Sequence, residues 1–177
     1  MLADFVLIGA ALVIVLAVLS AAAHLRTRTP YGGTPPAVAQ AMVVLAGLRS
    51  GETALDPGAG DARLLIAAER ACPGIRAVGY ELSPAVWLCG RVRLFLSRSG
   101  ARLYLRDALC ADVSAVDVVF LYAGPEMMRA FAEKFARELR PGTRIVSHFF
   151  RLPGREPVTT QEVATGRKKR RVFLYVW

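Results

Sequence analysis

The chain has 177 residues, of which 54% are hydrophobic and 21% charged, and its formal net charge is +9. This length suits one domain with a short appendage, and the composition excludes a disordered or fibrous protein. The cysteines Cys72, Cys89 and Cys110 lie far apart, without the paired spacing of a metal site. We therefore expect reduced, structural thiols and no bound metal.

An apolar segment without charged residues occupies residues 5–23. A helix of about 20 such residues spans the hydrocarbon core of a bilayer, and the run is long for a secretory signal. Asp4 precedes the segment, whereas His24 and Arg26 follow it. Because basic residues stay on the cytoplasmic side, we expect residues 1–24 to form a single-pass anchor, with the remaining chain in the cytoplasm. A cleaved signal and a buried core helix are the alternatives.

A linker rich in proline and glycine over residues 25–36 separates this anchor from a domain over residues 37–177. In the domain, short apolar runs alternate with helical patterns. We expect strands over residues 52–56, 76–81, 101–107, 117–123 and 143–150, and helices over residues 36–48, 61–71, 84–97 and 125–140. Residues 157–165 and 170–177 flank a basic turn like a hairpin. The order predicts an α/β fold: a Rossmann-like, doubly wound, mostly parallel seven-stranded sheet with an antiparallel C-terminal hairpin.

The stretch DPGAGDAR, residues 56–63, forms the turn after the first strand. In a doubly wound sheet, ligands bind at such a turn. Gly58 and Gly60 lack side chains, so the backbone can bend sharply and approach a ligand. Asp56 ends the strand, where a carboxylate suits the ammonium group of S-adenosylmethionine (SAM). The N–H groups of the turn would suit the carboxylate of that ligand.

The next two strands also end in carboxylates, Glu81 and Asp107. At the second strand end, a carboxylate accepts hydrogen bonds from ribose hydroxyls, in NAD as in SAM. At the third strand end, a carboxylate can accept from the amino group of adenine. Together the three strand ends predict a nucleoside site. The dinucleotide motif lacks its third glycine, with Arg63 in that place, so we favour SAM over NAD.

On these residues the chain resembles the class I, seven-strand SAM-dependent methyltransferases. The anchor, the YGGTP segment at residues 31–35, the DPGAGDAR loop, VGYELSP and DVVFLY make it similar to a family of small membrane-anchored protein-lysine methyltransferases. That family includes the mitochondrial enzymes that modify the adenine nucleotide translocase and the ATP synthase c-subunit, and it has bacterial relatives. Its loop usually reads DLGSGDGR, where this chain has Pro57, Ala59 and Ala62.

The resemblance implies roles for individual residues. Thr34, a candidate N-cap of the first domain helix, would also lie near the methionine moiety of SAM. Tyr122, after the fourth strand, would face the methyl acceptor. The expected cofactor-binding residues are Thr34, Asp56, Gly58, Gly60, Asp61, Glu81 and Asp107.

No strong general base for a lysine acceptor is evident. Tyr122 and Glu126 are the nearest catalytic candidates, although Glu126 equally suits the first turn of its helix, where a carboxylate is favoured. His148 is more typical of a buried strand-end histidine, and Met127 of a core residue. The tetrapeptide Asn-Pro-Pro-Tyr does not follow the fourth strand, which argues against methylation of adenine amino groups or glutamine amides.

The sequence therefore indicates a membrane-anchored, SAM-dependent methyltransferase, and the resemblance implies a lysine of a membrane-associated protein as acceptor. Two alternatives stay open. One is methyl transfer to a lipid or quinone-type small molecule. The other is a non-catalytic, membrane-tethered module that binds nucleosides or RNA through the basic turn GRKKRR, residues 166–171. We expect the lipid bilayer and a membrane protein as partners, rather than nucleic acid.

Overall fold

The structure is a computed structural model that describes residues 2–27 and 32–177. Arg28 and Tyr31, which belong to the expected linker, lie outside the described residues. The helices are α1 (Leu2–Thr27), α2 (Pro36–Ala46), α3 (Arg63–Ala71), α4 (Pro84–Leu96), the short 3-10 helix η1 (Ala108–Cys110) and α5 (Pro125–Glu138). The strands are β1 (Thr53–Asp56), β2 (Arg76–Glu81), β3 (Arg102–Leu105), β4 (Val118–Leu121), β5 (Arg144–His148), β6 (Thr159–Thr165) and β7 (Lys168–Val176).

The strands form one seven-stranded sheet in the order β3-β2-β1-β4-β5-β7-β6. The strands β1 to β5 are parallel, whereas β7 runs antiparallel to β5 and β6 antiparallel to β7. The predicted fold class is thereby confirmed. The strand order reverses between β1 and β4, and such a switch point opens a crevice at the carboxyl ends of the strands.

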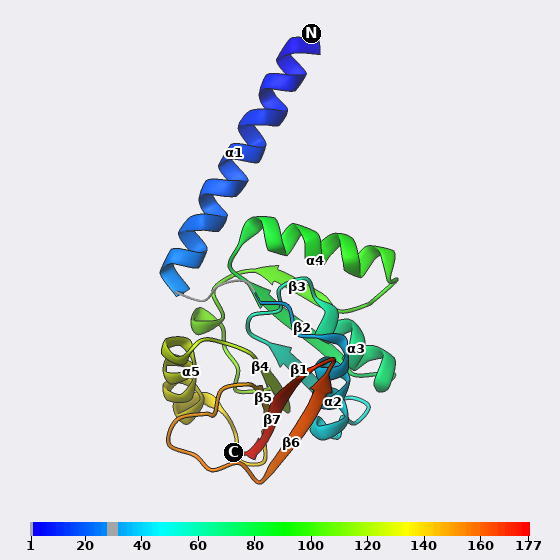
Figure 1. Ribbon diagram of the computed structural model, residues 1–177, viewed down its shortest axis with the longest axis vertical. Helices are drawn as coiled ribbons and strands as arrows, with labels where there is room; N and C mark the ends of the chain where they lie inside the picture. The colour runs from blue at the N-terminus through cyan, green and yellow to red at the C-terminus, as the bar shows by residue number, and fades with distance from the viewer. Residues whose placement is uncertain (1, 28–31) are drawn as a thin grey trace.

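Side chains of the central strands alternate between two apolar layers. In β4, Val118 packs in the layer covered by α2 and α3, and Val119 packs in the layer covered by α5. In β5, Val146 and Ile145 repeat this division. All four are fully buried, so the sheet is a central layer with helices on both faces (Figure 1).

The helix α1 extends away from the domain (Figure 1). Its residues Asp4–Ala23 form a stretch of 20 residues with a mean hydropathy of 2.9, long and apolar enough to cross a membrane. Near its C-terminal end α1 packs against α4. There Ser20 and Ala23 are buried, and the Ser20 hydroxyl accepts a hydrogen bond from the backbone N–H of Ala85 (3.2 Å). The helix continues to Thr27, beyond the expected end of the anchor at residue 24.

Some local expectations are wrong. The N-cap position of α2 is Pro35 instead of Thr34, and no side chain caps this helix. A proline at the first helical position suits this start, because its missing N–H would have no partner there anyway. The helix η1 is absent from the predicted elements, since three residues carry no periodic pattern. Cys89 and Cys110, which we expected to be structural thiols, are exposed, because α4 and η1 lie at the surface.

Candidate active site

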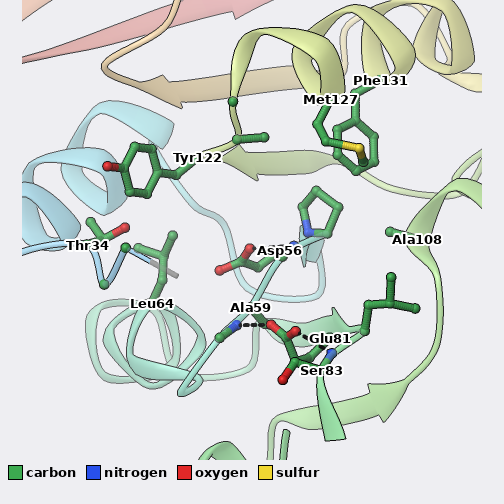
Figure 2. Close-up of a pocket in the computed structure, with 18 of the residues that line it drawn as sticks. Thr34, Asp56, Ala59, Leu64, Glu81, Ser83, Ala108, Tyr122, Met127 and Phe131 are labelled. Carbon is green, nitrogen blue, oxygen red and sulfur yellow. Dashed lines mark hydrogen bonds between the residues drawn. The ribbon is translucent and has the colours of Figure 1, made fainter. Parts of the chain in front are cut away.

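A cavity of about 410 Å³ opens at the carboxyl ends of β1, β2 and β4. Figure 2 shows Asp56 near its centre, with Thr34 and Tyr122 on one side and Glu81 and Ala108 on the other. All the residues that we expected to bind cofactor line this cavity, namely Thr34, Asp56, Gly58, Gly60, Asp61, Glu81 and Asp107. The topology brings them together because parallel strands end at the same edge of the sheet.

Three backbone N–H groups of the glycine loop donate hydrogen bonds within the protein. Gly58 N–H donates to an oxygen of Asp56 (3.2 Å), and Ala59 N–H donates to a carbonyl oxygen of β2 (2.9 Å). Gly60 adopts the left-handed conformation with φ +55°, and its N–H donates to Glu81 Oε2 (3.0 Å). We expected such amides to hold the carboxylate of a ligand. In the structure these three amides donate within the protein, and their contact with a ligand carboxylate stays a prediction.

Asp61 lines the cavity but is held by two arginines. Its carboxylate forms ion pairs with Arg63 (2.6 Å) and Arg93 (3.1 Å). Burial alone would raise the pKa of Asp61, but hydrogen bonds and positive charge from Arg63, together with the charge of Arg93, outweigh burial and lower it. Arg63 also donates to the backbone carbonyl of Thr34 (3.1 Å). In the sequence Arg63 is the last residue of the DPGAGDAR loop, but no local pattern predicts its contact with the Thr34 segment.

Asp56 is buried, with 6% of its surface exposed. Burial raises the pKa of Asp56 from 3.8 to about 7, and the negative charges of Glu81 and Asp61 act in the same direction, against the N–H of Gly58. All the charged groups that contribute to this shift are therefore anionic. A cation bound beside Asp56 would reverse the shift, which is the property expected of a site for an ammonium group.

Glu81 is oriented by two backbone donors. Its Oε2 accepts from Gly60 N–H (3.0 Å) and its Oε1 from Ser83 N–H (2.8 Å), shown as dashed lines in Figure 2. The hydroxyl of Ser83 is buried and has no hydrogen-bond partner in the part of the chain that the structure describes. Asp107 caps η1 by accepting from Leu109 N–H (2.9 Å). Ser83 also lines the cavity. The sequence contains no sign of this, because a serine before a proline indicates only the start of a helix.

The two catalytic candidates differ in position. Tyr122 lines the cavity, and its ring lies 4.2 Å from the ring of His148 between centroids. Glu126 is exposed in the first turn of α5 and does not line the cavity, in agreement with the alternative stated for it.

Neither nitrogen of the buried His148 has a hydrogen-bond partner among the described residues. Burial lowers the pKa of His148 to about 4, with a smaller effect from Arg170, so its imidazole is neutral near pH 7.

Several residues from distant segments complete the walls of the cavity, and no sequence motif assigned them to the site. They are Ala23 of α1, Met127 and Phe131 of α5, Phe149 and Phe150 after β5, and Arg170 of β7. The Arg170 guanidinium lies 5.8 Å from the centroid of the Phe149 ring, and its buried Nε has no partner among the described residues. Met127 is expected in the core from its sequence context. Arg170 belongs to the stretch GRKKRR, which we expected to be a turn, but residues 168–171 of that stretch lie in β7.

Comparison with known sequences identifies related enzymes. Residues 56–159 match the ANTKMT methyltransferase domain. A protein-lysine N-methyltransferase of Saccharolobus islandicus is 30% identical over 154 residues, which cover 83% of this chain and 92% of that protein. The adenine nucleotide translocase lysine N-methyltransferase of Mus musculus is 32% identical over 148 residues, which cover 81% of this chain and 62% of that protein. The lysine N-methyltransferase of the ATP synthase c-subunit from Homo sapiens is 35% identical over 103 residues, which cover 56% of this chain and 42% of that protein.

Solved structures show the same architecture. An RNA methyltransferase from Salinibacter ruber in complex with S-adenosyl-L-homocysteine aligns with a TM-score of 0.74 and 28% identity, covering 82% of this chain and 93% of the other. A SAM-dependent methyltransferase from Thiobacillus denitrificans, also with S-adenosyl-L-homocysteine, aligns with a TM-score of 0.58 and 20% identity. It covers 72% of this chain and 54% of the other, and it supports the fold alone.

Proposed function

Because the chain belongs to the ANTKMT methyltransferase family and is a SAM-dependent methyltransferase, we propose that α1 anchors it in a membrane and that it methylates a lysine of a membrane-associated protein. One observation carries the proposal: Ala23, at the end of the apolar stretch, lines the same cavity as Asp56 and Tyr122. If α1 spans a bilayer, the cavity lies at the bilayer surface. Tethering there raises the effective concentration of membrane-bound acceptors without further contacts.

The cavity fits SAM by the chemistry of its walls. Asp56 would pair with the ammonium group, which explains why a carboxylate with a raised pKa is kept in a buried, anionic site. Glu81 would accept from the ribose hydroxyls, and Asp107 from the adenine amino group, while Thr34 would lie near the methionine moiety. When bound, SAM supplies an electrophilic methyl group on its sulfonium.

The acceptor half of the site would position a neutral amine and exclude water. A lysine must lose its proton before it can act as a nucleophile, since its reference pKa is about 10.4. Entry of the amine into an apolar cavity that also holds a cation favours the neutral form, with the proton released to solvent. Tyr122 would orient this amine, and Met127 and Phe131 would keep water from the reaction path. Glu126 has no part in this proposal.

The experiment compares cells with and without the gene by mass spectrometry of membrane-protein digests. Expression should add mono-, di- or trimethyl-lysine to at least one membrane protein, and Asp56→Ala should abolish the mark. Glu133→Ala, which removes an exposed carboxylate of α5, is the matched control and should leave the mark unchanged.

Other outcomes would redirect the assignment. A methylated lipid or quinone without any change in lysine would establish the small-molecule alternative. Methyl groups in RNA would point to the acceptor class named for the Salinibacter ruber enzyme. Salt-sensitive RNA binding without SAM binding would indicate the non-catalytic module instead.

A further inference from the structure

The helix α4 presents an apolar face that nothing in the described chain covers. Its inner side, with Gly90 and Leu94 buried, packs on α3 and on the β2–β3 edge of the sheet. The opposite side carries large apolar side chains at helical spacing, with exposed fractions of 46% for Leu88, 51% for Val92, 82% for Phe95 and 74% for Leu96. Contiguous exposed apolar surface of this kind marks a site of interaction with a protein or a membrane.

This face lies next to the base of α1. The two helices are in contact, and Ser20 of α1 accepts a hydrogen bond from Ala85 in the first turn of α4. Figure 1 shows α4 running across the direction of α1, on the side of the domain from which α1 extends. Since β2, β3 and α3 lie beneath α4, its outer face looks toward the region that α1 occupies.

The length of α1 leaves no spacer between the domain and a bilayer. The 20 residues Asp4–Ala23 rise about 1.5 Å each, which matches a hydrocarbon core of about 30 Å. The domain contacts Ser20 and Ala23, which belong to the last turns of that stretch. With α1 across a bilayer, the first turn of α4 must therefore lie at the lipid surface.

The charges of α4 suit the headgroup region. The helix contains no acidic residue. Arg91, whose guanidinium lies 5.9 Å from the Trp87 ring, is exposed on α4, and Arg98 is exposed just after it. Arginine beside an apolar stripe is typical of helices that lie in a membrane interface, and each nearby cation is attracted to anionic lipid.

We propose that the outer face of α4, formed by Leu88, Val92, Phe95 and Leu96, inserts into the interface of the bilayer that α1 spans. The inference rests on the anchoring stated under the proposed function. Two attachments, one across and one along the bilayer, fix the orientation of the domain. The cavity mouth, bounded by Ala23, then stays at the membrane surface, where it meets side chains of membrane proteins.

The test uses the full chain in vesicles of phosphatidylcholine and phosphatidylglycerol. Cys72, Cys89 and Cys110 are replaced by serine, and one cysteine carries an environment-sensitive fluorophore. The label is placed by Phe95→Cys on the α4 face, by Ile14→Cys in α1, or by Val44→Cys on α2 as the matched control. Phe95, Ile14 and Val44 are comparably exposed, at 82%, 63% and 67%.

Lipids with a spin label in the acyl chain should quench the fluorophore at the Phe95 and Ile14 positions and leave the Val44 position unquenched. Quenching at Ile14 without quenching at Phe95 would overturn the proposal and leave the anchor intact. Absence of quenching at Ile14 would instead refute the anchor. A blue-shifted but unquenched label at Phe95 would show that protein covers the face, which also overturns the proposal.

A second experiment changes the face itself. The double variant Phe95→Asp with Leu96→Asp should keep SAM binding, and a label placed by Val92→Cys in that variant should no longer be quenched.

Discussion

Asp56 has the least favourable electrostatic environment among the residues of the site. It is buried close to Glu81 and Asp61, and its pKa is raised to about 7. The ordinary value, 3.8, applies to the unfolded chain. Because the folded state holds the proton more tightly, the stability contributed by this group is fully present below about pH 4 and is lost as the pH rises through about 7.

Asp56→Asn should therefore stabilise the ligand-free protein at pH 8. The amide keeps an acceptor for Gly58 N–H and removes the buried charge, so the free energy of unfolding should rise by roughly 2–4 kcal/mol. The same variant should lose SAM binding, because it lacks the counter-charge for the ammonium group. Chemical denaturation and calorimetry measure the two effects. Glu133→Gln should change neither, and an unaltered stability of Asp56→Asn would contradict the energetic role of Asp56.

The affinity for SAM should depend on pH through the same carboxyl group. Below about pH 7 Asp56 is largely protonated in the free protein, and the proton must leave when the cation binds. The affinity should then fall by up to about tenfold per pH unit below pH 7 and level off above it. His148 does not titrate in this range, since its pKa is about 4. Calorimetric titrations at pH 6, 7 and 8 in two buffers would report the released proton, and a constant affinity would refute the coupling.

At the scale of elements, α4 and the glycine loop are packed against each other through Gly90. A Cβ at this position would lie 2.6 Å from a methyl carbon of Leu103 and 2.9 Å from the Gly60 carbonyl oxygen. Gly90→Ala should thus lower the free energy of unfolding by about 1–3 kcal/mol and, by displacing the loop, weaken SAM binding. Thermal unfolding and calorimetry together would show both losses.

Gly58→Ala is the matched control for Gly90→Ala. A Cβ on Gly58 would meet no heavy atom within 4 Å, and the residue lines the cavity. The free energy of unfolding should stay within about 0.5 kcal/mol of the parent, whereas SAM affinity should fall, because the added methyl group occupies ligand space. Normal SAM binding by this variant would mean that the ligand does not approach the loop at Gly58.

At the scale of the whole molecule, the charges around α1 predict its orientation. Asp4 lies at the N-terminal end of the apolar stretch, and basic residues follow its C-terminal end. A reporter that is active only in the cytoplasm should be active when fused after Trp177, and one that requires export should be inactive. Replacing Asp4 and Ala3 by lysine should reduce this bias. A mature chain that begins near Ala23 would show that the segment is a cleaved signal.

Much of the site followed from the sequence because it depends on local pattern and topology. Alternating strands and helices imply a parallel sheet, and parallel strands end at one edge, so Asp56, Glu81 and Asp107 had to converge. The glycines between Asp56 and Asp61 marked the turn for the same reason. These deductions need neither side-chain packing nor knowledge of distant contacts.

Only the tertiary structure decided which side chains face the cavity and what state they are in. Ala23 and Arg170 enter the wall from opposite ends of the chain, because α1 packs on α4 and β7 pairs with β5. Tyr122, in the loop after β4, lines the cavity, while Glu126, in the first turn of α5, is exposed, and the sequence pattern did not distinguish these two positions. The raised pKa of Asp56 likewise arises from burial beside other carboxylates, and burial is a property of the packed molecule rather than of a local sequence pattern.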